Sequence, residues 1–168
     1  TEDIPYYATQ KKVVLGHLNH ISPLSIDDYI RAGGYAGLAK AISKSPEQVV
    51  ETVKASGLRG RGGAGFPTGV KWEGALRQPV EDKYVVANGD EGDPGAFMDR
   101  ALMEGDPHAV IEGLIIGGYA IGAHNGILYV RNEYQLAVKD LKHSIAQAEE
   151  YGLLGESILG SGFSFRLS

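Results

Sequence analysis

Residues 57–72 read Gly-Leu-Arg-Gly-Arg-Gly-Gly-Ala-Gly-Phe-Pro-Thr-Gly-Val-Lys-Trp, and this stretch decides how the chain is interpreted. Its first thirteen residues contain six glycines and two arginines, and a lysine and a tryptophan follow. Glycine loses more backbone freedom on folding than any other residue. A folded chain therefore keeps so many only where φ must be positive or where something approaches more closely than a Cβ allows. The nearby cations indicate a planar or anionic ligand.

Several loop types share parts of this pattern. Gly-x-Gly-x-x-Gly at 60–65 matches the dinucleotide-binding fingerprint, but that fingerprint follows a strand, whereas here a helix expected over 46–56 precedes it. A P-loop requires Lys-Ser/Thr directly after its last glycine, and Gly69 is followed by Val-Lys-Trp. An RGG-type RNA-binding segment, usually repeated and basic, and a tight connector between helices remain as alternatives. We expect a loop that approaches a ligand closely.

The composition bounds the class of protein. A chain of 168 residues, 43% of them apolar, can bury one core of ordinary size, so one domain is the default. The net charge of −5 argues against a general nucleic-acid binder. Cysteine is absent, which excludes disulfides and iron–sulfur ligation within this chain. The longest apolar stretch, 114–123, is short and broken by glycines, so we expect a soluble, cytoplasmic protein without a membrane span.

Alternating strand and helix signals predict an α/β fold. Strands are expected over 83–88, 126–131 and 163–167, and helices between them over 106–123 and 135–151. This order implies parallel pairing through right-handed crossovers, and hence a Rossmann-like open parallel sheet with flanking helices. An N-terminal helical region is expected to precede the sheet, with helices over 26–32, 35–42, 46–56 and 68–77.

A second candidate site follows the first expected strand. Residues 88–93 read Asn-Gly-Asp-Glu-Gly-Asp, and ligands bind beyond the carboxyl ends of strands in open parallel sheets. An amide and three acids suit hydrogen bonding to hydroxyls, ring N–H groups or ribose. A calcium loop, whose full twelve-residue pattern is missing, and a solvated turn are the alternatives. Arg131 and Glu133 follow the second strand and are candidates for the cleft as well, but we favour a position on the surface.

Both sites carry a family resemblance. Residues 60–72 closely resemble the signature of the flavin-bearing NADH dehydrogenase subunits, which include the 51-kilodalton subunit of respiratory complex I and its relatives in NAD(P)-linked hydrogenases and formate dehydrogenases. Residues 88–100 resemble the second signature of this family, and 104–113 continue it. Gly92 and Asp93, where respiratory members usually have a non-glycine residue and Glu, resemble the hydrogenase branch more.

The resemblance implies a function. An FMN would lie beyond the sheet with NAD(H) or NADP(H) stacked on it, a hydride would pass between the two, and electrons would pass to iron–sulfur clusters outside this chain. The partners would be iron–sulfur subunits of a multi-subunit complex, either a soluble hydrogenase or a formate dehydrogenase. The alternatives are a respiratory complex I flavin subunit and a non-catalytic structural or assembly fragment. Neither nucleic-acid binding nor direct membrane insertion is implied.

The resemblance also implies roles for residues of the glycine-rich loop. Three would pass along the isoalloxazine, where side chains would block stacking: Gly60, Arg61 and Gly62. Three would meet the nicotinamide nucleotide: Gly63, Gly65 and Phe66. Lys71 would place a positive charge near the flavin and favour its reduced anionic form, which makes it one of two implied catalytic residues.

The strand-end residues would complete the site. By the same resemblance, Asn88 and Asp90 would hydrogen-bond the flavin, with Glu91 as a weaker member of this set, and Glu91 would also be the second catalytic residue. Asp93 would approach the nicotinamide ribose with a shorter reach than Glu. No metal ligand is implied in this chain.

The resemblance covers only part of the family's length. Family members continue past the third strand with further FMN-binding residues, a ubiquitin-like domain and a four-cysteine iron–sulfur domain, none of which is present. We therefore expect a fragment of a longer subunit, in which residues 1–24 are a lead-in and residues 25–168 are a partial FMN- and NAD-binding domain, truncated at its C-terminal end. Any [4Fe-4S] cluster would lie in the missing C-terminal part.

Overall fold

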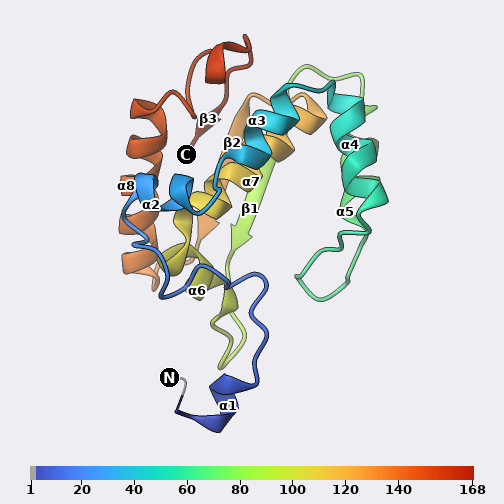
Figure 1. Cartoon of the computed structure of the whole chain (residues 1–168). Helices are drawn as coiled ribbons and strands as arrows, with labels where there is room; N and C mark the ends of the chain where they lie inside the picture. Colours follow the sequence, from blue (N-terminus) through green and yellow to red (C-terminus); the bar gives the residue numbers. More distant parts are fainter. Residues whose placement is uncertain (1–2) are drawn as a thin grey trace.

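A computed structural model describes residues 3–168 and contains a three-stranded sheet (Figure 1). The strands are β1 (Tyr84–Gly89), β2 (Asn125–Val130) and β3 (Arg166–Leu167), and they are parallel and adjacent in chain order. β1 and β2 pair from Tyr84 opposite Asn125 to Gly89 opposite Val130, so both strands end at the same edge. The predicted α/β fold with an open parallel sheet is confirmed.

The helices leave one face of this sheet exposed, where Tyr84 and Val86 of β1 and Ile127 and Tyr129 of β2 lie, and most helices lie where the sequence predicts them. Their bounds are α1 (Pro5–Ala8), α2 (Ile26–Arg31), α3 (Ala36–Ile42), α4 (Pro46–Ala55), α5 (Thr68–Leu76), α6 (Met98–Gly105), α7 (Pro107–Ile121) and α8 (Gln135–Glu150). Among them, α1 and α6 are absent from the sequence-based expectations. In the part of the chain that the structure describes, no helix is both long and apolar enough to span a membrane.

The third strand is shorter than predicted. The alternating pattern at 163–167 predicts five strand residues, but only Arg166 and Leu167 pair with β2. Phe165 instead exchanges two backbone hydrogen bonds with Gly155, with N–O distances of 2.9 and 3.0 Å, in an antiparallel bridge. Its ring is fully buried against α7, where a Cβ at Gly118 would overlap it. The apolar residues of this segment therefore fill the core instead of extending the sheet.

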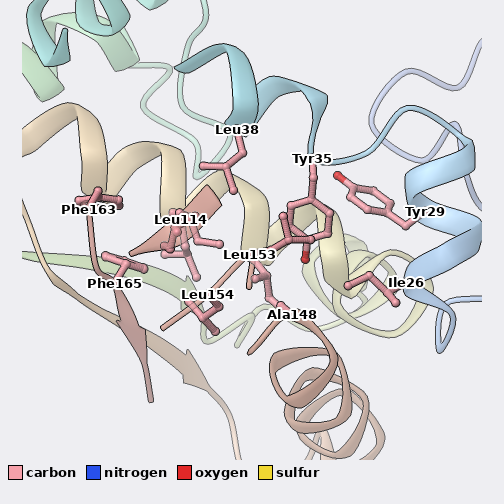
Figure 2. Packing of buried hydrophobic residues seen from close by; sticks show 13 residues of the cluster. Ile26, Tyr29, Tyr35, Leu38, Leu114, Ala148, Leu153, Leu154, Phe163 and Phe165 are labelled. Carbon is pink, nitrogen blue, oxygen red and sulfur yellow. The ribbon is translucent and has the colours of Figure 1, made fainter. Parts of the chain in front are cut away.

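Helix α7 is the centre of the core. Asp106 caps its start by accepting a hydrogen bond from the Ala109 amide (3.3 Å), and the helix ends at Gly122, which has φ of 73°. The main cluster of buried residues packs α7 against α2, α3, α8 and the C-terminal segment (Figure 2). Its members are Ile26, Tyr29, Tyr35, Leu38, Ile111, Leu114, Ile115, Ala148, Leu153, Leu154, Ile158, Phe163 and Phe165.

A buried carboxylate fixes the N-terminal helices onto α7. Glu112 accepts hydrogen bonds from the Tyr29 hydroxyl (2.6 Å) and from the amides of Tyr35 and Leu38 (2.9 Å each). Burial first, and then this carboxylate, raise the pKa of the Tyr29 hydroxyl, so the hydroxyl stays a donor. Three donors satisfy a charge that would otherwise be costly to bury. The junction of α2 and α3 is therefore held by a specific polar contact as well as by apolar packing.

Helices α4 and α5 form a closely packed pair that carries the glycine-rich loop. The predicted capping box of α4 is present: Ser45 Oγ accepts from the Gln48 amide (3.3 Å), and Gln48 Oε1 accepts from the Ser45 amide (3.0 Å). Gly69 in α5 lies so close to α4 that a Cβ would be 2.5 Å from the Lys54 backbone nitrogen. This glycine therefore serves helix packing, and the loop between the helices leaves from a fixed base.

Candidate functional site

The glycine-rich loop has an ordered stem and an open tip. At the stem, the Thr68 amide donates to the Leu58 carbonyl and the Gly60 amide donates to the Phe66 carbonyl, each at 2.9 Å. The Arg59 guanidinium reaches across and donates to the Gly65 carbonyl (2.5 Å). The tip residues 61–64 are exposed. The stem therefore presents the tip residues to solvent.

The conformation explains some of the loop's glycines but not all of them. Gly63 and Gly65 have φ of 108° and 60°, where glycine is strongly favoured. Gly60 and Gly62 lie outside that region. A Cβ on Gly62 would meet no protein atom within 4 Å, and one on Gly60 would make only ordinary contact with Phe66. The fold of the described residues therefore does not require glycine at 60 or 62.

An open groove runs beside this loop. It has a volume of about 570 Å³, and its lining includes four small or glycine residues and two arginines, from Ser56, Gly57, Leu58, Arg59, Gly60, Arg61 and Gly65. That volume lies within the usual range of small-molecule sites. Among the described residues, no hydrogen bond or ion pair engages the Arg61 side chain. The groove can therefore offer bare backbone and positive charge to a flat, anionic ligand.

Phe66 and Lys71 lie where the loop enters α5. Phe66 is exposed despite its large apolar side chain, and Lys71 lies exposed in the first turn of the helix. Within residues 3–168 the Lys71 ammonium makes no hydrogen bond or ion pair. Both side chains are thus available to a ligand, as the implied roles require.

The strand-end loop is turned tightly at the end of β1. The Asn88 side-chain oxygen accepts a hydrogen bond from the Asp90 amide (2.9 Å), and the Gly92 amide donates to the Asp90 carbonyl (3.1 Å). Gly89 is buried under α6, where a Cβ would lie 2.9 Å from Met103 Sδ. The carboxylates of Asp90 and Asp93 are exposed and have no hydrogen-bonding partner in the described part of the chain.

Glu91 differs from these two acids because its carboxylate is occupied. Its two oxygens accept hydrogen bonds from the backbone amides of Asp99 (3.0 Å) and Arg100 (3.2 Å), at the start of α6. Burial alone would raise the pKa of Glu91, but these bonds and one from the Tyr134 hydroxyl (3.3 Å) outweigh it and lower the pKa. The structure therefore assigns an ionised Glu91 to capping α6, and its catalytic use stays a prediction.

Tyr134 is the residue beside the strand-end loop that the sequence did not indicate. Arg131 was considered for the cleft as well as for the favoured surface position; it is partly exposed, and its Nη1 donates to the Glu91 backbone carbonyl (2.5 Å). The Tyr134 hydroxyl lies 3.4 Å from the same carbonyl. The contact follows from the register of the two strands. Val130 pairs with Gly89, so the segments that follow β1 and β2 leave the sheet at the same edge and lie close together. Glu133 is exposed, as expected.

The two loops lie at the same end of the fold. Both project on the side toward which β1 runs (Figure 1). No hydrogen bond or ion pair joins them among residues 3–168. Nor does any group of three His, Asp or Glu side chains in this range come together as a metal site would require.

Comparisons with known proteins agree with the geometry. The family model of the Nuo51 FMN-binding domain matches residues 53–163. The chain is 59% identical over 156 residues to the HndC subunit of the NADP-reducing hydrogenase of Solidesulfovibrio fructosivorans, and 49% identical over 143 residues to the F subunit of the NADH-quinone oxidoreductase of Aquifex aeolicus. These matches cover 93% and 85% of this chain, but only 32% and 33% of the relatives, so the chain spans about a third of their length.

The fold is also similar to a solved structure. The NAD+-reducing [NiFe]-hydrogenase in its air-oxidized state superposes with a TM-score of 0.69 and 29% sequence identity, over 95% of this chain and 24% of that one. The family model covers well over half of the chain, and it includes both the glycine-rich loop and the strand-end loop. The chain belongs to the Nuo51 FMN-binding domain family.

Proposed function

We propose that this chain forms one part of a binding site for FMN and a nicotinamide nucleotide, in a subunit of an NAD(P)-linked oxidoreductase. The observation that carries the proposal is the pair Gly60 and Gly62, at which the fold does not require glycine, with Gly60 lining the groove beside the loop. Family membership supports FMN as the cofactor. The identity to the NADP-reducing hydrogenase relative is higher than that to the NADH-quinone oxidoreductase relative, which supports a hydrogenase-type complex.

The glycine-rich loop fits a flavin in shape and charge. A flat ring system needs backbone without side chains beneath it, and Gly60 and Gly62 offer this. When bound, FMN supplies the conversion between a two-electron hydride and single electrons. Lys71 would hold a positive charge near the ring, and the Arg61 guanidinium would contribute a second positive charge. Gly63, Gly65 and Phe66 would contact the nicotinamide nucleotide.

The strand-end loop supplies directional groups. Asn88 and Asp90 would hydrogen-bond the flavin, and Asp93 would reach the ribose of the nucleotide. The exposure of both aspartates, without partners among the described residues, supports these roles. Glu91 would act by holding the loop, since its carboxylate already caps α6.

The partners and the location are also proposals. The matched relatives are named as subunits, which supports an assembly with other chains. We infer that iron–sulfur subunits accept the electrons and that the complex works in the cytoplasm, with residues 25–168 as part of a larger FMN- and NAD-binding domain. Any [4Fe-4S] cluster of the same subunit would lie outside the present sequence.

A titration tests the proposal. The full-length subunit that contains this chain should quench FMN fluorescence, and Gly62→Val should weaken binding at least about tenfold, because the added side chain occupies the ring's position. Gly74→Val is the matched control, since a Cβ at Gly74 also meets no atom within 4 Å but lies on α5, away from the tip of the glycine-rich loop. Absence of quenching by the wild-type subunit would reject the proposal. If the full-length subunit quenches FMN fluorescence and the 168-residue chain alone does not, this chain would be a fragment that needs the rest of the pocket to bind FMN.

A further inference from the structure

We propose that Arg131, supported by Tyr134, is a positioning residue that fixes the strand-end loop and thereby sets the affinity of the site for its ligands. The proposal rests on the proposed function, because the loop matters only if Asp90 and Asp93 contact a ligand. Arg131 acts through Glu91, whose backbone carbonyl it binds.

The Arg131 guanidinium is fixed in orientation. Three of its nitrogens donate hydrogen bonds: Nη1 to the Glu91 carbonyl (2.5 Å), and Nε and Nη2 to the Glu133 carboxylate (3.2 and 3.1 Å). A planar guanidinium can make these bonds at once, whereas an ammonium cannot reproduce their geometry. Glu133 therefore orients the group that reaches across from the end of β2 to the loop after β1.

Tyr134 supports the same contact. The Arg131 guanidinium carbon lies 5.5 Å from the centre of the Tyr134 ring, within the range of a cation–π contact. The Tyr134 hydroxyl also lies within hydrogen-bonding distance of Glu91, at 3.3 Å from the carboxylate. The Tyr134 side chain thus contacts both the Arg131 guanidinium and Glu91, the residue that this guanidinium binds.

Glu91 is consequently held at both of its ends by different elements. The start of α6 binds its carboxylate, and the connection between β2 and α8 binds its carbonyl. The carboxylates of Asp90 and Asp93, on either side of it in the chain, make no hydrogen bond or ion pair in the described residues. Their position therefore depends on the backbone of the loop, which is held by the turn between Asn88 and Asp90 and by the two contacts of Glu91. A fixed loop binds more tightly because its ordering cost is met before the ligand arrives.

Loss of this contact should loosen the loop without unfolding the protein. Arg131 and Glu133 lie outside the three buried apolar clusters, and pairs at this degree of exposure contribute little to global stability. The amides of Asp99 and Arg100 report on the loop directly, because both donate to the Glu91 carboxylate.

The experiment compares Arg131→Ala and Arg131→Lys with Arg31→Ala in the full-length subunit. Arg31 is a matched control because it also pairs with a carboxylate, Asp28 at 2.6 Å, but on α2. Without ligand, hydrogen exchange at residues 90–100 should be at least about fivefold faster in Arg131→Ala and unchanged in Arg31→Ala. With ligand, the FMN dissociation constant or the nucleotide KM should rise about tenfold in Arg131→Ala and less in Arg131→Lys, with an unchanged melting temperature.

The outcomes separate this proposal from the proposed function. Unchanged hydrogen exchange at residues 90–100 in Arg131→Ala would show that Arg131 does not fix the strand-end loop. Faster exchange with unchanged ligand affinities would show that fixing the loop does not affect ligand binding. A wild-type subunit that binds no FMN would reject the proposed function, and exchange would still decide whether Arg131 fixes the loop. A strong fall in the melting temperature of Arg131→Ala would mean that Arg131 supports the fold as a whole. Normal ligand affinities in Arg131→Lys would then confirm that Arg131 has only this structural role.

Discussion

The two loops at the proposed site are built in opposite ways. In the glycine-rich loop, the hydrogen bonds lie at the stem, and Gly62 and Gly63 at the tip offer backbone without side chains next to Arg61. In the strand-end loop, a single residue, Glu91, receives hydrogen bonds from α6 and from the connection between β2 and α8. One loop is defined by the side chains that are missing, and the other by side chains that are held.

We relate this difference to the role proposed for each loop. A surface for a flat ring needs area and no obstruction, so small errors in backbone position cost little there. Groups that hydrogen-bond a ligand must be correct in direction as well as in position. We therefore expect the glycine-rich tip to become ordered when a ligand binds, and the strand-end loop to be ordered beforehand.

The largest effect should come from the base of the glycine-rich loop. Gly69→Val would push α5 away from α4, because even a Cβ would overlap the Lys54 backbone. Such overpacking should lower the free energy of unfolding by about 3 kcal/mol, measured by urea denaturation. Gly62→Val in the same loop should leave that free energy unchanged, because its Cβ meets open space. Equal stability of the two variants would show that the loop's glycines do not divide into packing and surface roles.

The next effect concerns the strand-end loop. Glu91→Gln removes the charge that caps α6 and should cost about 1 kcal/mol near neutral pH. The pKa of Glu91 is lowered in the fold from its ordinary value of 4.5, so the charge stabilises the protein above pH 4.5 and this contribution is lost as the pH falls through the folded-state pKa. The stability difference between Glu91→Gln and wild type should therefore shrink in acid.

A control separates this effect from a change in surface charge. Glu149 lies at an exposed position of α8, and its carboxylate makes no hydrogen bond or ion pair among residues 3–168. Glu149→Gln should therefore leave the free energy of unfolding unchanged from pH 7 to pH 3. A difference for Glu91→Gln that stays constant across this range would contradict the capping role.

Local patterns predicted the parts of the fold that local physics determines. The capping box at Ser45, the proline that starts α7 and the strand β1 are all read from adjacent residues, although β1, expected to be buried, exposes Tyr84 and Val86. Helix α6 escaped prediction because its cap, Glu91, lies seven residues before its first residue. β3 was predicted too long because Phe165 pairs with Gly155, which only the tertiary structure brings near.

The candidate site divides in the same way. Composition and the family resemblance identified the glycine-rich loop, and the family is confirmed, although the individual ligand contacts stay predictions. The contact of Arg131 with Glu91 was not predicted because it depends on the pairing register of β1 and β2. No residue near Arg131 in the sequence indicates that partner, which lies forty positions away.

The smallest effect should be at Asp93, and it tests the comparison most finely. Asp93→Glu lengthens an exposed side chain that has no partner in the described residues, so the melting temperature should not change. If the held loop aims this residue at the nucleotide, the longer reach should change the nucleotide KM by about threefold while leaving the FMN dissociation constant unchanged. The same substitution at the exposed Asp82, before β1, is the control and should change neither quantity. A change in FMN affinity with Asp93→Glu would mean that the strand-end loop presents this residue to the flavin, and the assignment of Asp93 to the nucleotide would then be wrong.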